Sequence, residues 1–345
     1  MTRSPDDLRA ALRDQAGHCA ALDSPFMERL CCLLADRLTA GTPLTDRLFQ
    51  WPGDMSPRGE SIPLRLCGAL HALCLEGRAG LADVYPPHDK GDDDMWSAIY
   101  HAFESETSFI NTFLNSAPQT NEVRRSAALI GAGHWLADRT NLPFITSELG
   151  ASAGLNLNWD HYGMVVRGQH FGAPEPILTL HPDWNGPLPP NTAPRVVDRA
   201  GVDLNPLDPR SDSLRLRAYL WPDQPERLTL TTAAIAAAQM PDMGDAVDWL
   251  EPRLTTPRNG HLHLIYHTVA WQYFPPTVQT RETELIMAAG ARATDDAPIA
   301  WLGMEGDGST PGAALTLRLW PGDGAPIHLA RVDYHGRWVN WLAPA

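Results

Sequence analysis

The stretch LPFITSELGASAGLNLNWDHYG, Leu142 to Gly163, decides the fold of this chain. It opens with the apolar run 143–145, turns through Gly150, Ser152 and Gly154, and continues into a segment with apolar residues at helical spacing. An apolar run, a turn of very small residues and a periodic segment predict a strand, a tight loop and a helix. Small residues let a ligand approach the backbone, and the free N–H groups of a new helix favour polar or negative ligand groups.

Glu148 ends the apolar run and comes directly before the small-residue turn. An acid followed by G-x-(small)-x-G resembles the first nucleotide-binding loop of the class I S-adenosylmethionine-dependent methyltransferases, where these residues hold the cofactor. The resemblance implies an S-adenosylmethionine site that contains Glu148, Gly150, Ser152, Gly154 and Asn156. The alternative is that the glycines serve only the backbone conformation of a tight strand-to-helix turn.

Residues 150–154 also match G-x-S-x-G, the nucleophile elbow of α/β-hydrolases, with Ser152 as the nucleophile. The chain order of nucleophile, acid and base is compatible with this hypothesis, for which the candidates are Asp203 or Asp295 as the acid and His267 or His335 as the base. The hypothesis ranks second, because an elbow normally follows several strands and an oxyanion-hole loop. The preceding chain instead has the pattern of helices and contains no HGGG run.

Composition and charge exclude some classes of protein. The chain has 345 residues, enough for two domains or one large one, and its 43% hydrophobic residues can fill a core. The formal net charge is −14 with no dense basic patch, which argues against non-specific nucleic-acid binding because phosphates need cationic surface. No run approaches the length of a membrane span, and MTRSPDDLRA lacks the apolar core of a signal peptide. We expect a soluble, cytoplasmic protein with a small-molecule substrate, no nucleic-acid or membrane partner, and an oligomeric state that the sequence leaves open.

The cysteines and histidines show no metal-site spacing. None of the 5 cysteines belongs to a C-x-x-C pair, and all lie in apolar periodic segments: Cys19, Cys31, Cys32, Cys67 and Cys74. Reduced, buried thiols are expected. His261 and His263 would point two imidazoles the same way from a strand but have no third ligand nearby, so no metal is expected.

Residues 1–140 have the pattern of a helical region. Ser24-Pro25 is a typical helix start, a capping residue followed by proline, and an apolar face then recurs up to Leu38. The stretch from Trp96 to Leu114 predicts one long amphipathic helix. The acidic run 92–94 before it fits a solvated helix N-terminus better than a cation site.

Polar residues are dense just before the central stretch, at Gln119, Asn121, Glu122, Arg124 and Arg125. One explanation is a capped helix with a solvated first turn. The other is a polar cluster beside the glycine turn, because this helix leads directly into the central strand. On the second explanation the substrate-binding residues are Gln119, Asn121, Glu122 and Arg125.

Four segments together resemble an uncharacterised bacterial family, domain of unknown function 2332. They are QTNEVRRS at 119–126, ELGASAGLNLNWDHYG at 148–163, WQYFP at 271–275 and HGRWVNW at 335–341. The resemblance covers nearly the whole chain. It implies a helical N-terminal part leading into a methyltransferase-like Rossmann domain, and the family name carries no established activity.

Residues 141–345 predict a Rossmann-like α/β domain, interrupted at about 164–194 by an insertion of short strands and a proline-rich loop. In nucleotide-binding Rossmann domains an acid at the end of the second strand binds the ribose hydroxyls. Residues 196–204 predict that strand, with Asp203 as the candidate and Asp208 as the reserve; an ordinary turn acid is the alternative. The insertion would account for a separation from the glycine turn of more than twice the usual ~20 residues.

Apolar residues alternate over 262–266 and predict a strand that ends near His267. The carboxyl ends of strands line the ligand crevice in such a fold. Tyr266 and His267 are therefore candidates to orient or deprotonate a methyl acceptor, although a histidine in this position is also often structural. The candidate substrate-binding residues that follow are Trp271, Gln272 and Tyr273. The Asn-Pro-Pro-Tyr motif of many DNA and protein-amide methyltransferases does not occur here, which favours a small-molecule acceptor.

Later segments at 298–305, 314–319, 327–334 and 338–342 predict further strands, with a closing antiparallel pair at the end of the sheet. The expected fold is α/β, with a helical N-terminal region and a Rossmann-like, class I methyltransferase-like, mostly parallel sheet. The expected function is S-adenosylmethionine-dependent methyl transfer to a small molecule. A serine hydrolase, or a non-catalytic ligand-binding protein on the same fold, is the alternative.

Overall fold

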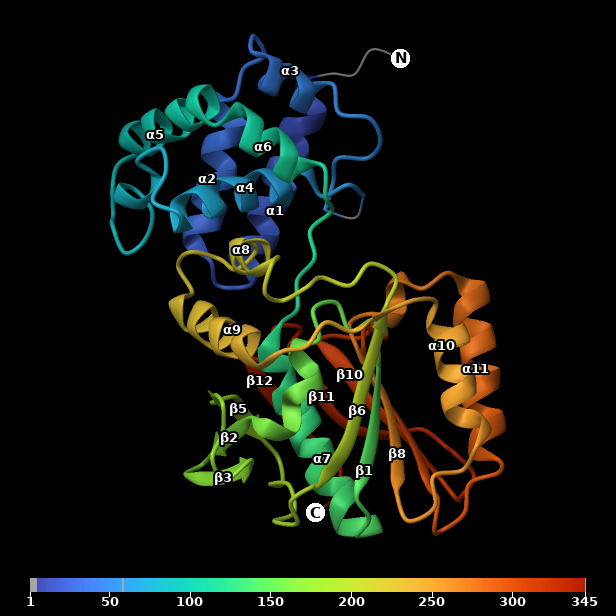
Figure 1. The fold of residues 1–345 in the computed structure, drawn as a ribbon. Coiled ribbons are helices and arrows are strands. Elements are labelled where there is room, and N and C mark those ends of the chain that lie inside the picture. Colours follow the sequence, from blue (N-terminus) through green and yellow to red (C-terminus); the bar gives the residue numbers. More distant parts are fainter. Residues whose placement is uncertain (1–4, 58, 345) are drawn as a thin grey trace. The chain divides into compact units, whose positions relative to one another are not determined.

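The computed structural model describes residues 5–57 and 59–344. They form two compact units, drawn in Figure 1. The helical unit contains the residues up to 120 together with 212–229, and the sheet unit contains 121–211 and 230–345. The sequence suggested a division at residue 140, whereas helix α7 (Ser126–Thr140) packs within the sheet unit, and helix α9 (Pro225–Ala237) contains the boundary at 229.

The helical unit consists of short helices around one apolar core. Its elements are α1 (Pro5–Ala21), α2 (Pro25–Arg37), α3 (Pro43–Phe49), α4 (Ile62–Leu75), η1 (Leu81–Asp83), α5 (Asp92–Ser105), α6 (Thr107–Leu114) and α8 (Ser213–Ala218). Ser24 begins α2 as predicted, because its Oγ accepts the Met27 N–H at 3.4 Å. The single helix expected up to Leu114 is wrong. Glu106 leaves the helical conformation at φ −120° and pairs with Arg78, so α5 ends there and α6 begins.

All five cysteines are free thiols in the helical unit, as expected. Cys19, Cys31 and Cys67 are buried, and the Cys31 and Cys67 sulfur atoms lie 3.8 Å apart. Burial raises the pKa of the half-buried Cys74 to about 11. The Cys74 thiol is therefore protonated at neutral pH, and the buried thiols serve as apolar packing groups.

One large sheet organises the sheet unit. Its strands are β1 (Phe144–Leu149), β5 (Asp183–Asn185), β6 (Val196–Asp203), β7 (Asp242–Met243), β8 (Leu262–Thr268), β9 (Ile299–Glu305), β10 (Ala313–Trp320), β11 (Ile327–Val332) and β12 (Trp338–Trp341). The spatial order is β5-β12-β11-β10-β9-β8-β1-β6-β7. Neighbours are parallel in the pairs β1·β6, β1·β8, β6·β7, β8·β9 and β5·β12 and antiparallel from β9 to β12, so the predicted mostly parallel sheet is confirmed.

Strand β1 lies in the middle of the parallel part. The chain leaves β1 for β6 and β7 on one side and returns for β8 and β9 on the other, so the strand order reverses between β1 and β8. Every residue of β1 and β8 is buried, as expected for parallel strands that are covered on both faces. In open α/β sheets such a reversal opens a crevice at the carboxyl ends of the strands.

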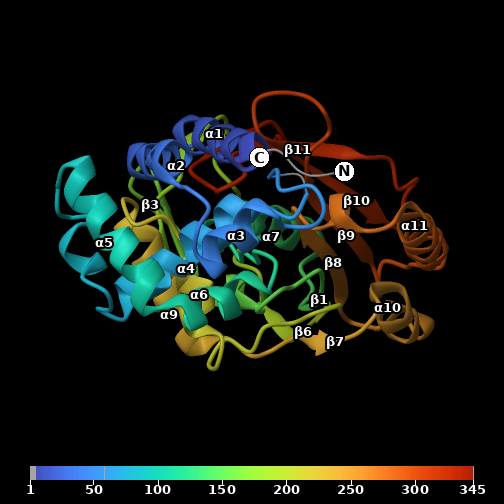
Figure 2. The same cartoon turned by 90° about the horizontal axis from the view of Figure 1, so that it is seen from above.

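Helices cover both faces of this sheet. Figures 1 and 2 show α10 (Ala246–Thr255) and α11 (Pro276–Gly290) on one face and α7 on the other. The α10/α11 face has an apolar core that includes Leu149, Val202 and Ile265 from three adjacent strands. Helices cover the two faces, and the parallel strands β1, β6 and β8 have their carboxyl ends at the same edge of the sheet.

The predicted insertion forms a small sheet of its own. Strands β2 (Gly163–Val166), β3 (Gln169–Gly172) and β4 (Thr179–Leu180) lie in the order β3-β2-β4. The short strands expected there are confirmed. Residues 183–185, expected as loop, form β5 instead, because Trp184 stacks on Trp341 with ring centroids 5.4 Å apart and brings this segment to the edge of the large sheet.

The helix predicted after the glycine turn is wrong. Residues Leu155–His161 form a 3₁₀ segment, η3, which is interrupted at Asn158 (φ −96°, ψ 20°) and leads into β2. The Leu155 N–H donates to Asn121 Oδ1 at 2.9 Å, so the first amide of this segment is already bonded within the protein. An argument from a helix dipole therefore does not apply at this turn. The far end of the sheet also differs, with three antiparallel pairings from β9 to β12 in place of one closing pair.

Candidate functional site

Most of the residues singled out from the sequence lie at the carboxyl ends of β1, β6 and β8. Glu148 is the penultimate residue of β1, Asp203 ends β6, and Tyr266 and His267 lie near the end of β8. Gly150, Ser152, Gly154 and Asn156 follow β1, and Trp271, Gln272 and Tyr273 follow β8. Gln119 belongs to the helical unit and is not part of this group.

The glycine turn has the backbone conformation that its residues suggest. Gly150, Ser152 and Gly154 have φ of 69°, 55° and 70°. A Cβ on Gly150 would lie 2.6 Å from the Ala270 Cβ, and one on Gly154 would lie 2.5 Å from the Gln239 carbonyl oxygen. The N–H groups of 150 and 151 donate to the Val202 carbonyl at 2.9 and 3.0 Å. Conformation and packing thus require both glycines, whatever the turn binds.

Asp203 is tied directly to this turn. Its Oδ2 accepts the Ser152 N–H at 2.9 Å and its Oδ1 accepts the Asn205 N–H at 2.9 Å. The residue is half-buried. Each carboxylate oxygen has two lone-pair sites, so Asp203 keeps capacity to accept hydroxyl groups from a ligand.

Glu148 and Tyr266 form a buried pair beneath the turn. The Tyr266 hydroxyl lies 3.3 Å from Glu148 Oε2 and 3.2 Å from the Asn156 carbonyl oxygen. Burial, with a smaller contribution from Asp203, raises the pKa of Glu148 to about 8 against the opposing effects of Tyr266 and Arg125. A hydroxyl carries one proton, so when Tyr266 donates to the carbonyl, a protonated Glu148 completes the second bond by donating to Tyr266.

His267 has both ring nitrogens occupied. Nδ1 bonds Glu305 Oε1 at 2.8 Å, and Nε2 accepts the Trp301 indole N–H at 3.1 Å. The Trp271 ring stacks on the imidazole at a centroid distance of 4.9 Å. A proton-accepting role for Nε2 would require the bond from Trp301 to break, so this geometry favours positioning over base catalysis.

Glu305 was not singled out from the sequence, yet it organises the loop after β8. Its Oε1 also accepts the backbone N–H groups of Ala270 at 2.9 Å and Trp271 at 3.1 Å. Burial alone would raise the pKa of Glu305, but the bonds from His267 and these two N–H groups lower it below its usual value. Its Oε2 is buried and has no hydrogen-bond partner among residues 5–57 and 59–344. An acid at the end of a strand predicted next to the His267 strand was the signal available in the sequence.

The polar segment before α7 forms hydrogen bonds to several loops of the sheet unit. Asn156 accepts from Ser126 Oγ at 2.7 Å and donates to the Glu122 carbonyl at 3.3 Å. Arg125 donates to the Tyr334 carbonyl at 2.9 Å and to the Thr268 carbonyl at 3.1 Å. Asn121, Glu122 and Arg125 are all buried, so the solvated first turn that we considered is wrong for these residues. They hold the loops that follow β1 and β8 in fixed positions.

Ser152 lacks the partner that a hydrolase requires. Its Oγ is buried and makes no hydrogen bond to any residue in the described part of the chain. A nucleophilic serine needs a base within hydrogen-bond reach. The two nitrogens of His267, one of the candidate bases, are bonded to Glu305 and Trp301.

The histidine pair near the start of β8 does not form a metal site. His263 Nε2 bonds Ser147 Oγ at 2.9 Å inside the sheet, whereas His261 is near the surface and bonds the Asn259 carbonyl at 2.9 Å. Within the described ranges, no group of three or more His, Cys, Asp or Glu side chains could hold a metal ion.

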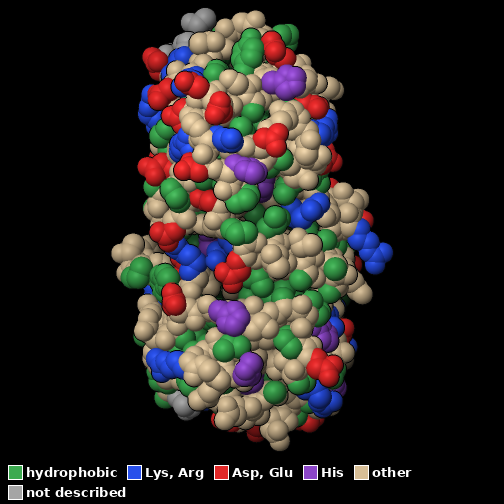
Figure 3. Space-filling view, turned by 90° about the vertical axis from the view of Figure 1, so that its left-hand side faces the viewer, with side chains coloured by type: hydrophobic (Ala, Val, Ile, Leu, Met, Phe, Trp, Pro, Cys, Tyr) green, Lys and Arg blue, Asp and Glu red, His purple; other side chains and the backbone are tan. Residues whose placement is uncertain are grey.

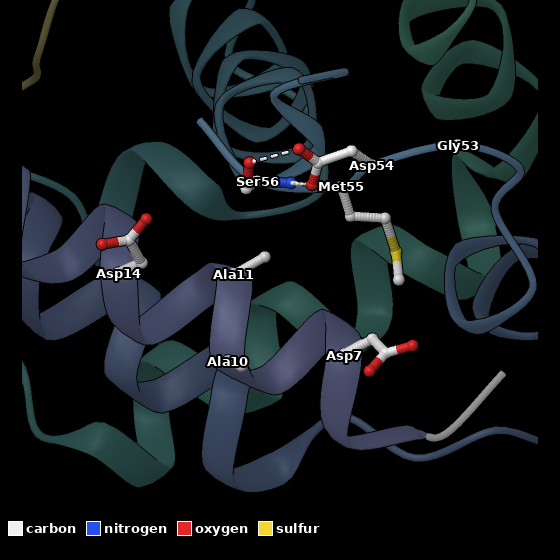
Figure 4. Close-up of a pocket in the computed structure, with 8 residues that line it drawn as sticks. All are labelled: Asp7, Ala10, Ala11, Asp14, Gly53, Asp54, Met55 and Ser56. Atoms are coloured by element: carbon white, nitrogen blue, oxygen red, sulfur yellow. Dashed lines mark hydrogen bonds between the residues drawn. The ribbon is translucent and has the colours of Figure 1, made fainter. Parts of the chain in front are cut away.

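The helical unit contains a pocket of about 420 Å³ between α1 and the loop at 53–56. Figure 4 shows Asp7 and Asp14 on the helix and Asp54 bonded to Ser56 on the loop. Acidic side chains alone do not define a binding site, and none of the residues predicted for function lies there. On the face drawn in Figure 3, acidic and basic side chains are interspersed.

No helix among the described residues is long and apolar enough to cross a membrane.

Comparison with known proteins identifies the family of this chain but no relative of known activity. No curated protein and no solved structure matches the chain. A family model, described as an uncharacterised protein conserved in bacteria (DUF2332), matches residues 9–341. The chain therefore belongs to the DUF2332 family, as its motifs predicted.

Proposed function

We propose that the sheet unit binds S-adenosylmethionine and transfers its methyl group to a small-molecule acceptor. The observation that carries the proposal is the position of Asp203, which ends the strand beside β1 and accepts the Ser152 N–H of the glycine turn at 2.9 Å. An acid in this position binds ribose hydroxyls in nucleotide-binding sheets.

The strand order supports the same proposal. Numbered in chain order among themselves, the five strands β7-β6-β1-β8-β9 run 3-2-1-4-5, which is the order of doubly wound nucleotide-binding sheets. The antiparallel strand β10 then follows β9. We infer a Rossmann-like sheet of the class I methyltransferase type, with the cofactor above the reversal between β1 and β8.

In this proposal the protein acts mainly by positioning. Asp203 accepts the ribose hydroxyls, and the buried Glu148 becomes ionised when a cationic group of the cofactor approaches, since a nearby positive charge lowers the pKa of a carboxyl group. Tyr266 and His267 orient the loops around the acceptor, because their polar atoms are already bonded. Alignment of the acceptor with the sulfonium methyl group supplies most of the rate enhancement over the uncatalysed reaction.

A thermal-shift titration with S-adenosylmethionine and S-adenosylhomocysteine tests this proposal, with NAD as the control ligand. A ligand that binds only the folded protein raises the free energy of unfolding by about 2.7 kcal/mol at a ligand concentration of a hundred times Kd. The Tm rises as a result. We expect a saturable shift that Asp203→Asn abolishes and the matched variant Asp208→Asn retains. No shift in the wild-type protein at millimolar ligand would contradict the proposal.

The strained backbone of Ser152, at φ 55°, is the observation that favours a serine hydrolase as the second candidate, because a nucleophile elbow holds its serine in a strained turn. Labelling with a fluorophosphonate probe distinguishes the two functions. Labelling of the wild-type protein that Ser152→Ala removes supports the hydrolase. Binding of S-adenosylhomocysteine that Ser152→Ala leaves intact supports the methyltransferase, because that site needs only a small residue at this position.

A further inference from the structure

In the described part of the chain, the Glu305 carboxylate pairs with no lysine or arginine side chain. Its only ionic contact there is His267, and the Trp301 indole N–H donates to His267 Nε2. Nδ1 is therefore the ring nitrogen that donates to Glu305. The three N–H donors on Oε1 favour the ionised form of Glu305 without neutralising it.

The Oε2 atom of Glu305 is the carboxylate oxygen available to accept a hydrogen bond from a ligand. Oε2 is buried and unbonded within residues 5–57 and 59–344. An orphan polar atom in a folded protein usually marks a bound water, ion or ligand group. The Glu305 side chain is 16% exposed and the neighbouring Gln272 is exposed, so this end of β9 opens to solvent.

Aromatic rings lie around His267, which bonds Glu305, and further acceptors lie beside the next residue, Gly306. Trp271, whose N–H bonds Glu305, is half-buried, and its ring centroid lies 5.5 Å from that of Trp301. Indole faces attract cations. A Cβ placed on Gly306 would lie 2.8 Å from the Tyr334 hydroxyl oxygen and 3.7 Å from Gln272 Oε1. An ammonium group has three N–H donors and no acceptor, which matches three oxygen acceptors beside an aromatic wall.

We propose that Glu305, with Trp271, Gln272 and Tyr334, binds the cationic nitrogen of an amine-bearing methyl acceptor. The proposal rests on the proposed function only in calling the ligand a methyl acceptor. The site lies at the ends of β8 and β9, across the strand reversal from Asp203, so that cofactor and acceptor would occupy opposite sides of one crevice. It concerns the anchoring of the substrate and specifies no bond that is made or broken.

Ligand-observed NMR with propylammonium as the probe and 1-propanol as its neutral isostere tests the site. We expect saturable binding of propylammonium and none of 1-propanol. Glu305→Gln, which keeps an oxygen for the loop N–H groups, should weaken binding by about tenfold or more, the loss expected for a charge-assisted hydrogen bond. Glu284→Gln, which removes an exposed charge from α11, is the matched control and should leave binding unchanged.

Two further variants keep the test decisive if Glu305→Gln does not fold. Gly306→Ala places a methyl group in the space between Tyr334 and Gln272 and should weaken propylammonium binding with the charge intact. Trp271→Leu removes the aromatic wall but retains the backbone N–H that bonds Glu305, and should also weaken it.

The outcomes separate this proposal from the function on which it builds. Equal propylammonium binding by wild type, Glu305→Gln and Gly306→Ala would overturn the amine site, and so would no saturable binding by the wild-type protein. Either result leaves a thermal shift with S-adenosylhomocysteine intact. Loss of propylammonium binding in the variants, together with no shift by the sulfur nucleotides, would support the amine site and overturn the methyltransferase.

Discussion

Glu282 is a carboxyl group that the fold keeps in its neutral form. It lies on α11, is fully buried, and neither of its side-chain oxygens has a hydrogen-bond partner in the described residues. Burial, with a smaller contribution from Asp245, raises its pKa from 4.5 to about 8. Between these values the folded protein keeps a proton that the unfolded chain has lost, so the stability contributed by neutral Glu282 falls as pH rises through this window.

We predict that Glu282→Gln stabilises the protein at pH 8.5 and has little effect at pH 4.5. Glutamine is neutral at both values, so the variant removes a cost of about 1.4 kcal/mol for each unit of the pKa shift. Denaturant unfolding at the two pH values measures the difference, and Glu284→Gln on the exposed side of the same helix is the control. An equal effect of Glu282→Gln at both pH values would contradict the assignment.

The Tyr266 hydroxyl lies within hydrogen-bond distance of two buried oxygens, which makes Tyr266 a second residue whose role can be tested. Tyr266→Phe leaves Glu148 Oε2 and the Asn156 carbonyl without this partner. We predict a loss of about 1–3 kcal/mol in the free energy of unfolding, the usual cost of an unsatisfied buried group. Tyr273→Phe removes the same atom from a side chain that is 76% exposed and should cost almost nothing, which equilibrium denaturation can verify.

The residue pattern located one half of the candidate site better than the other. Glu148, the glycine turn and Asp203 lie at strand ends that alternation and turn residues mark in the sequence. Glu305 and Trp301 contact His267 across separations of 38 and 34 residues. No local pattern identifies which of several distant polar groups will meet in a buried bond, so this pairing was missed.

At the scale of elements, two loops pack against each other through Gly150 and Ala270. We predict that Gly150→Ala destabilises the protein by about 1–3 kcal/mol, because φ is 69° and the new methyl group would lie 2.6 Å from the Ala270 Cβ. Ala270→Gly removes the clash but leaves the backbone strain. The double variant should therefore be more stable than the sum of the single changes by about 0.5–3 kcal/mol. Strict additivity in denaturation experiments would mean that the two loops are not in contact.

Elements with strong local patterns were predicted well, and those set by distant packing were not. The strands β1, β6, β8 and β9 follow from short apolar runs that end at acids, histidines or glycines. Strand β5 is held by the stacking of Trp184 on Trp341, and the 3₁₀ form of η3 follows the bond from Leu155 to Asn121. Such contacts join residues remote in sequence, so periodicity does not reveal them.

For the whole molecule, the helical unit depends on a segment that comes late in the chain. Asp223 accepts from Ser24 Oγ at 2.6 Å and from the Phe26 N–H at 3.0 Å, and Tyr219 packs on Phe113 at 5.7 Å. We predict that residues 1–120 alone show no cooperative thermal transition by circular dichroism. The same residues joined by a long Gly-Ser linker to 212–229 should show one.

A matched variant of the joined polypeptide, Asp223→Ala, tests whether the late segment acts through its contacts or only by adding length. It should lower the transition temperature, because it leaves the start of α2 without its acceptor. A cooperative transition of residues 1–120 at the midpoint of the joined polypeptide would refute the dependence.

The late return of the chain to the helical unit has a consequence for its synthesis. A ribosome produces the helices of residues 5–114 first, yet Ala218, Tyr219 and Trp221 complete their core only about 100 residues later. At about 5–20 residues per second this delay lasts about 5–20 s. During that interval the apolar faces of these helices are exposed, and β1 has been made without its neighbour β8. We therefore expect the growing chain to expose apolar surface until the late segment is made, and slower translation to lengthen this exposure.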